Sequence, residues 1–161
     1  MKIVTEALDA VRKTPLNGVM TLDQRIADSF ARQSMLATLG AELDRVAAGE
    51  VVISAPILDS SRQQHGVAHA ALTFALGDTA AGYSALTLLP ADTEVMTAEI
   101  KINLLAPGRG QRLRATGRVL KPGRRLVVVA ADVHAIDGET ETLVAVLQGT
   151  MVPVAPAVTH A

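Results

Sequence analysis

The chain contains no cysteine and no tryptophan, and its 161 residues include only two phenylalanines and one tyrosine. Without cysteine there can be no disulfide, no zinc-thiolate site and no cysteine nucleophile. With so few aromatic side chains, Ala, Val, Leu and Ile must build the core. The composition fits a reducing compartment, and the length suits one folded domain.

An excess of charge of either sign is also missing. Fifteen basic and sixteen acidic residues give a net charge of −1 at pH 7, so the overall charge attracts neither nucleic acid nor an anionic membrane. Residues 1–14 carry five charges and lack the apolar core of a secretory signal. The longest charge-poor stretch, residues 63–91, contains two His, Asp78 and Pro90, which argues against a transmembrane helix. We therefore predict a cytoplasmic protein without nucleic-acid or membrane partners.

The apolar residues that are present follow a helical period first and a strand period later. Residues 2–38 repeat apolar positions at helical spacing and predict a lead-in of two short helices, broken around residues 15–18. Residues 40–46 and 51–57 are typical of two strands. Residues 68–89 are rich in Ala and Leu and lack an internal proline, which predicts a helix buried on most sides.

Four strands are predicted after this helix. In the first, five apolar residues alternate with polar ones and should face the core: Met96, Ala98, Ile100, Ile102 and Leu104. The other three are predicted at residues 113–119, 126–136 and 141–152, with Asp137 and Gly138 as a turn signal. We expect these four strands to form an antiparallel meander, so that one sheet curls around one helix, and residues from 153 on to form a loose tail.

Asp78 is the only charged residue between Arg62 and Asp92, and it lies in the middle of the predicted buried helix. Burial of a carboxylate costs several kcal/mol unless it is paired, hydrogen-bonded or protonated, so this residue is a candidate for function. Gly77 and Gly82 flank Asp78 and would let another surface approach closely. The alternative is that Gly77 breaks the helix and Asp78 caps a second one.

The stretch from residue 63 to residue 80 resembles the signature of PaaI-like hotdog-fold acyl-CoA thioesterases. In that family a G-x-x-H-G-G segment opens the central helix, an Asp or Glu follows nine residues after the His, and a Gln or Asn stands six residues before it. The matching positions are Gly66, His69, Asp78 and Gln63. In one departure, Ala70 and Ala71 replace the two glycines of the family, which puts the geometry of the turn in question.

The resemblance implies an α+β hotdog fold, in which an antiparallel sheet wraps around one long central helix, here with an N-terminal helical lead-in. It covers residues 40–152. We accordingly expect residues 1–161 to form a single hotdog domain, with residues 1–38 as the lead-in and residues 153–161 as the tail.

The resemblance also implies hydrolysis of a small aryl or short- to medium-chain acyl-CoA by water, without a metal or a cofactor. Asp78 would act as nucleophile or general base, and the N–H of Ala70 would hold the thioester oxygen at the positive end of the helix. Gln63 would polarise the carbonyl or orient water, and His69 would fix the turn. The resemblance further implies that each site lies between two subunits, one of which supplies the acid and the other the helix start. A homodimer or homotetramer is therefore expected.

The remaining candidate residues concern substrate binding. Coenzyme A carries phosphates, and the best local basic cluster is Lys121, Arg124 and Arg125, with Arg118 nearby. These charges could instead be solvated and protect a sheet edge. Four further residues are expected to contact the acyl group or the thioester: Gly66, Ala71, Phe74 and Tyr83.

Two other functions stay open at this point. One is a non-catalytic hotdog domain that binds acyl-CoA as a ligand or effector, which the missing glycine pair would favour. The other is a hotdog hydratase or dehydratase, although such relatives usually pair an Asp and a His at another spacing. His65, His134 and His160 are weaker candidates for chemistry than His69.

Overall fold

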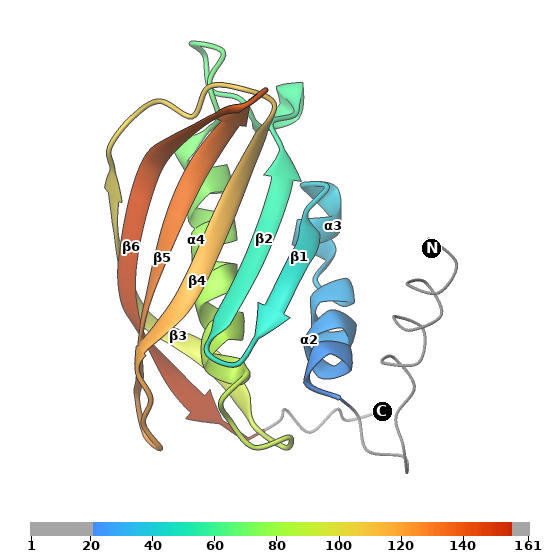
Figure 1. Ribbon diagram of the computed structural model, residues 1–161, viewed down its shortest axis with the longest axis vertical. Coiled ribbons are helices and arrows are strands. Elements are labelled where there is room, and N and C mark those ends of the chain that lie inside the picture. Colours follow the sequence, from blue (N-terminus) through green and yellow to red (C-terminus); the bar gives the residue numbers. More distant parts are fainter. Residues whose placement is uncertain (1–20, 156–161) are drawn as a thin grey trace, which may run out of the picture.

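One antiparallel sheet of six strands wraps around one long helix (Figure 1). The computed structural model describes residues 21–155. The helical elements are α2 (Leu22–Ala31), α3 (Ser34–Thr38), η2 (Asp59–Ser61) and α4 (Ala70–Leu86). The strands are β1 (Glu42–Ala47), β2 (Glu50–Pro56), β3 (Glu94–Leu104), β4 (Arg112–Lys121), β5 (Val127–Asp137) and β6 (Thr140–Val154). The predicted fold class is confirmed, and the predicted bounds of these elements differ from the observed ones by a few residues.

The central helix α4 packs against the sheet through small residues. A Cβ atom at Gly117 of β4 would lie 2.2 Å from the carbonyl of Ala80, and one at Gly77 would lie 2.7 Å from the Leu147 side chain. Around these contacts the core consists of aliphatic side chains such as Leu76 and Leu86. Because α4 runs without interruption from Ala70 to Leu86, Gly77 does not break it, and the alternative interpretation of Asp78 as a cap is wrong.

The order of strands in the sheet is β1-β2-β4-β5-β6-β3, so the predicted meander of four strands is wrong for β3. Only β4, β5 and β6 follow one another as neighbours; β3 pairs with β6, and β4 pairs with β2. The physical reason lies in the connection after β3, residues 105–111, which contains Pro107 and Gly108. This segment is too long for a two-residue hairpin, and it carries the chain across the sheet. β3 consequently forms an edge of the sheet.

The residues of β3 that face the core also differ from the prediction. Ile100 and Ile102 pack against the core as expected, but Met96 is 63% exposed and Val95 takes its place at the core. Leu104 is 55% exposed. The register of β3 shifts against β6 between Thr97 and Glu99, and this irregularity reverses the alternation of side chains along the strand.

The helical lead-in packs beside the end of α4. The guanidinium group of Arg25 in α2 donates to the carbonyl oxygens of Leu89 at 3.0 Å and Thr93 at 2.5 Å, and Ile26 is fully buried. The side chain of Thr21 caps the start of α2 by accepting from the Gln24 N–H. The part of the predicted lead-in before residue 21 lies outside the described residues.

The predicted loose tail begins later than expected. Pro153 is part of β6 and pairs with Val95 of β3. A proline is tolerated there because Met151 is the last residue of β6 that pairs with β5, so that one side of the strand has no partner at Pro153. Residues 156–161 lie outside the described residues.

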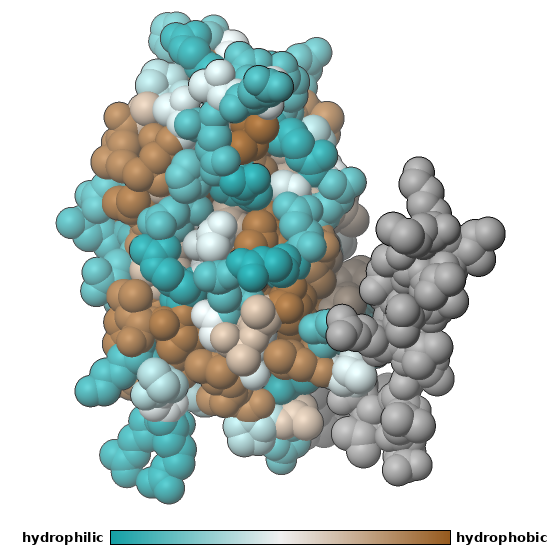
Figure 2. All heavy atoms as spheres, viewed as in Figure 1, coloured by the Kyte–Doolittle hydropathy of each residue, from teal (hydrophilic) through white to brown (hydrophobic). Residues whose placement is uncertain are grey.

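The face of the sheet turned away from α4 carries paired charges. Arg118 donates to Asp132 at 2.6 Å, and Arg112 donates to Glu42 at 2.5 Å. Figure 2 shows hydrophilic side chains gathered over the middle of this face. Within residues 21–155, no helix has the length and apolar character needed to cross a membrane.

Candidate active site

Asp78 lies on the one stripe of α4 that the sheet leaves open. Leu72, Leu76 and Ala80 of this helix are buried against the sheet, whereas Phe74 is 39% exposed and Asp78 is half-buried. Asp78 is the only charged residue of α4. The lone carboxylate therefore faces a crevice instead of the core, so that it is not buried among apolar side chains.

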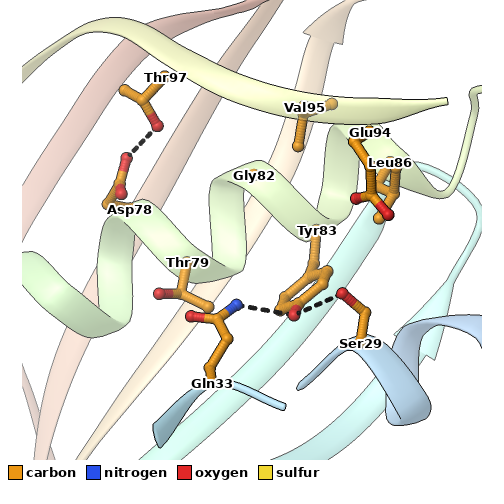
Figure 3. A pocket seen from close by; sticks show the side chains of 10 residues that line it. All are labelled: Ser29, Gln33, Asp78, Thr79, Gly82, Tyr83, Leu86, Glu94, Val95 and Thr97. Atoms are coloured by element: carbon orange, nitrogen blue, oxygen red, sulfur yellow. Dashed lines mark hydrogen bonds between the residues drawn. The ribbon is translucent and has the colours of Figure 1, made fainter. Parts of the chain in front are cut away.

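A small polar pocket opens beside Asp78, between α4, α2 and β3 (Figure 3). Its volume is about 170 Å³, and we call it the acid pocket. The hydroxyl of Thr97 in β3 donates to Asp78 Oδ1 at 2.8 Å. On the opposite wall, Gln33 Nε2 donates to the Tyr83 hydroxyl at 2.7 Å, and this hydroxyl donates to Ser29 Oγ at 3.1 Å. Tyr83 thus fixes the lead-in helix as a wall of the pocket.

A larger pocket of about 540 Å³ lies along the same open stripe, and we call it the apolar pocket. It shares Gln33, Asp78 and Thr79 with the acid pocket. The rest of its lining is mostly apolar and comes from α3, α4 and β3: Met35, Leu36, Ala70, Ala71, Phe74, Ala75, Ile102 and Leu104. Asp78 therefore stands where a polar pocket meets an apolar one.

His69 caps the start of α4. Its Nδ1 accepts a hydrogen bond from the Ala71 N–H at 2.9 Å, so this nitrogen carries no proton. Among residues 21–155 the N–H of Ala70 has no acceptor, and it lies at the positive end of the helix dipole. Ala70 and Ala71 are both helical, a conformation that alanine adopts readily, so this turn does not require the glycine pair.

Gln63 lies before this helix start, in a turn that Gly66 makes possible with a φ of 77°. The Gln63 side-chain oxygen accepts from the His65 N–H, and its backbone oxygen accepts from the Gly66 N–H at 2.9 Å. Gln63 and Ala70 line one pocket of about 400 Å³. We call this cavity the turn pocket.

The structure does not bring all the predicted site residues together within one chain. Ala70 and Asp78 are eight residues apart on α4, which corresponds to about 12 Å along the helix axis. A single thioester carbon cannot lie within about 3 Å of both groups. The acid lies in the middle of α4 and the predicted oxyanion donor at its start, so one chain does not bring the two groups to a single thioester.

The predicted basic cluster is divided as well. Arg118 points to the outer face of the sheet, where it pairs with Asp132. Lys121 and Arg125 are exposed at the hairpin between β4 and β5. Arg124 lines a hollow together with Leu88, which follows the C-terminal end of α4. The hairpin is thus separated from Ala70 by the length of α4, about 25 Å.

Sequence reasoning missed Thr97, Ser29 and Gln33. The alternation of β3 placed Thr97 on the solvent side, and no sequence signal marks the irregularity that turns it toward α4. Ser29 and Gln33 belong to the lead-in, for which no role in the site was predicted. Within the described residues, no group of three or more His, Asp or Glu side chains is arranged to hold a metal ion.

Comparisons with known proteins identify the family of this fold. The model of the thioesterase superfamily matches residues 65–142. A thioesterase family protein from Silicibacter pomeroyi is 36% identical, with a TM-score of 0.82 over 84% of this chain and 100% of that chain. The PaaI protein of Escherichia coli, from the phenylacetic acid degradation operon, has a TM-score of 0.76 over 84% of this chain and 95% of that one. It is 19% identical in sequence, so this similarity shows that the two proteins share a fold.

Two further relatives add detail. A thioesterase of Staphylococcus aureus is 25% identical, with a TM-score of 0.70 over 77% of this chain and 100% of that one. It has been solved with alanine in place of a glutamine and, separately, with alanine in place of a glutamate fifteen positions further on. A candidate esterase of Saccharolobus solfataricus is 31% identical over 91 residues, which is 56% of this chain; the chain spans only 64% of the length of that relative.

The antiparallel sheet wrapped around one long helix defines the class of hotdog-fold proteins. Within this class, the chain belongs to the thioesterase superfamily. The resemblance drawn from the motif around His69 and Asp78 is thereby confirmed.

Proposed function

We propose that this protein hydrolyses acyl-CoA thioesters to the free acid and coenzyme A, with Asp78 as the reacting carboxylate. The observation that carries this proposal is the position of Asp78, half-buried at the junction of the acid pocket and the apolar pocket. In the Staphylococcus aureus thioesterase, the two residues replaced by alanine are a glutamine and, fifteen positions on, a glutamate. Gln63 and Asp78 have the same spacing (78 minus 63), which supports a shared pair of roles.

The apolar pocket supports a small acyl group as the substrate. Its volume of about 540 Å³ lies within the range of small-molecule sites, roughly 300–1,000 Å³. Phe74, Ile102 and Leu104 supply apolar surface. We therefore propose a small aryl or a short- to medium-chain acyl-CoA as the substrate.

The reaction needs water and no metal or redox cofactor. In one route Asp78 takes a proton from water while the water oxygen attacks the thioester carbon; the C–S bond then breaks, and the thiolate of coenzyme A leaves and is protonated. In the other route the carboxylate of Asp78 attacks the thioester carbon, the C–S bond breaks, and the thiolate of coenzyme A leaves and is protonated; water then hydrolyses the resulting anhydride, which releases the free acid and restores the carboxylate. In both routes the N–H of Ala70 would stabilise the oxyanion, and the Gln63 amide would polarise the carbonyl or orient the water.

A second copy of the chain is the proposed source of the missing half of the site. Because Ala70 and Asp78 of one chain lie about 12 Å apart, the donor near one Asp78 would come from a neighbouring subunit. β3 is an edge strand, and exposed apolar side chains lie around the open stripe, including Met35 at 60%, Leu104 at 55% and Leu105 at 55%. Such edges and patches are usually covered. We propose a homodimer, or a tetramer built from it, in the cytoplasm.

The proposal is tested by Asp78→Asn, with Asp92→Asn as the matched control on an exposed loop. Release of free thiol from a panel of aryl, short and medium acyl-CoAs is measured for both variants. The amide cannot act as a base or nucleophile, so kcat should fall roughly 100- to 10,000-fold for Asp78→Asn, whereas Asp92→Asn keeps the wild-type rate. Circular dichroism and thermal unfolding should show the same fold for all three proteins. Hydrolysis by Asp78→Asn at the wild-type rate contradicts the assignment.

The non-catalytic alternative is tested on the wild-type protein. Isothermal titration calorimetry with the same acyl-CoAs measures binding independently of turnover. Tight binding without release of thiol would favour a domain that senses acyl-CoA. Turnover with any member of the panel would favour the hydrolase.

A further inference from the structure

The edge strand β3 contains a bulge directly opposite α4. Thr97 pairs with Met151 of β6, whereas Glu99 pairs with Thr150, so Ala98 is an extra residue on β3. In an unbroken strand every second side chain would face α4. The bulge shifts by one residue the alternation of side chains that face α4. Val95 and Thr97 therefore line the acid pocket before the bulge, and Ile102 lines the apolar pocket after it.

Gly149 of β6 makes room for this bulge. It pairs with Ile100 of β3, and a Cβ atom at this position would lie 2.5 Å from the carbonyl oxygen of Glu99 and 2.8 Å from the Ile100 side chain. The bulged strand can approach β6 this closely only because residue 149 has no side chain. Two separate strands thus contribute to the direction of the Thr97 side chain.

Among the described residues, Thr97 is the only hydrogen-bond partner of the Asp78 carboxylate. The hydroxyl has one proton, and its other neighbour, Met151 Sδ at 3.4 Å, is a weak acceptor. The proton therefore goes to Asp78 Oδ1 at 2.8 Å (Figure 3). Thr97 is β-branched and sits on a strand, which limits the rotation of its hydroxyl.

We propose that Thr97 is a positioning residue for Asp78, aimed at it by the bulge at Ala98. The hydroxyl holds Oδ1 and so fixes the rotation of the carboxylate, which leaves Oδ2 to meet water or the thioester carbon. The inference rests on the proposed function, because it assigns Thr97 to the same reaction. A displacement of about 1 Å at a reacting group can cost roughly 100-fold in rate, so a single orienting hydrogen bond matters.

The test compares Thr97→Val, which keeps the shape and removes the hydroxyl, with Thr97→Ser, which keeps the hydroxyl. We expect kcat to fall about 10- to 100-fold in Thr97→Val with KM changed less than about 3-fold, and Thr97→Ser to stay within about 5-fold of the wild type. Thr150→Val on the neighbouring strand β6 is the matched control and should keep the wild-type kcat. A wild-type kcat in Thr97→Val, or a loss that Thr97→Ser shares, would overturn the proposal.

A double mutant separates this inference from the proposed function. If Thr97 acts through Asp78, then adding Thr97→Val to Asp78→Asn should lower the residual rate by less than about 2-fold, because the effects of coupled residues do not add. A further loss equal to that of Thr97→Val alone would mean that Thr97 acts independently of Asp78. If Asp78→Asn is inactive while Thr97→Val is fully active, only the positioning role fails. If Asp78→Asn is fully active, the proposed function fails first.

Discussion

His69 links the folding of α4 to its proposed chemistry. Its Nδ1 accepts the Ala71 N–H, whereas the preceding N–H, that of Ala70, has no acceptor within the described part of the chain. An N-cap of this kind satisfies one of the four N–H groups that a helix cannot bond internally. The side chain that stabilises the helix therefore caps the N–H of Ala71 and not that of Ala70, the residue that lines the turn pocket.

The capping role of His69 predicts a loss of stability in His69→Ala. Removal of a side-chain cap typically costs about 1 kcal/mol of the free energy of unfolding, and His69→Asn should retain most of it because the Asn oxygen can accept the same N–H. Urea denaturation followed by circular dichroism measures both variants against the wild type. Equal stability of His69→Ala and the wild type would show that the Nδ1 contact does not stabilise the helix.

Residues of the site differ in how far the sequence predicts them. Asp78 stands out because it is the only charge in an apolar helix, and the spacing from His69 adds a family resemblance. Thr97 does not stand out, because its direction depends on a bulge that also requires a glycine on another strand, Gly149. A contact that depends on two strands distant in sequence leaves no periodic signal in either one.

Among the elements, α4 packs closely against β4 at a glycine. Gly117 faces the backbone of Ala80 and Ala81, where a Cβ atom would come within 2.2–2.4 Å of main-chain atoms. Gly82, on the open stripe of α4, has only the Val95 side chain at 3.9 Å. One glycine is therefore needed for packing, and the other merely lowers helix propensity.

This difference predicts opposite effects for two Gly→Ala substitutions. Gly117→Ala forces backbone atoms apart and should lower the free energy of unfolding by more than about 3 kcal/mol, as large overpacking effects do. Gly82→Ala meets no close contact and should raise it by up to about 1 kcal/mol through helix propensity. Thermal and urea unfolding of the two variants provides the comparison. Similar stability of both would contradict the close packing of α4 on β4.

The elements themselves are largely predictable, whereas their neighbours in the sheet are not. Periodicity finds α4 and all six strands, because each one buries a face with its own period. The position of β3 beside β6 depends on the path of residues 105–111 across the sheet, and local pattern does not encode this path. No feature of the sequence predicted that the lead-in divides into α2 and α3 at Arg32 and Gln33.

For the whole molecule, the proposed dimer would bring together groups that lie at the two ends of α4. One chain places the donor at Ala70 and the basic hairpin around Arg124 at opposite ends of α4, about 25 Å apart. Two copies related by a twofold axis, with their helices antiparallel, would bring the hairpin of one copy near the helix start of the other. In that arrangement Asp78 of one copy, Ala70 of the second and a basic hairpin could contact one acyl-CoA.

A shared site predicts that two inactive variants restore activity when they are combined. Asp78→Asn removes the acid, and Gln63→Ala removes the amide beside Ala70; in a mixed dimer, one site carries both defects and the other carries neither. Mixed dimers, isolated by coexpression with two different affinity tags, should therefore show about half the wild-type kcat per dimer, whereas each parent homodimer stays near its own low rate. If each chain forms its own complete site, every site of the mixed dimer keeps one defect, and the rate is the mean of the two parents. Free-thiol release at saturating acyl-CoA distinguishes these results, and a rate no higher than the parental mean would contradict a site shared between subunits.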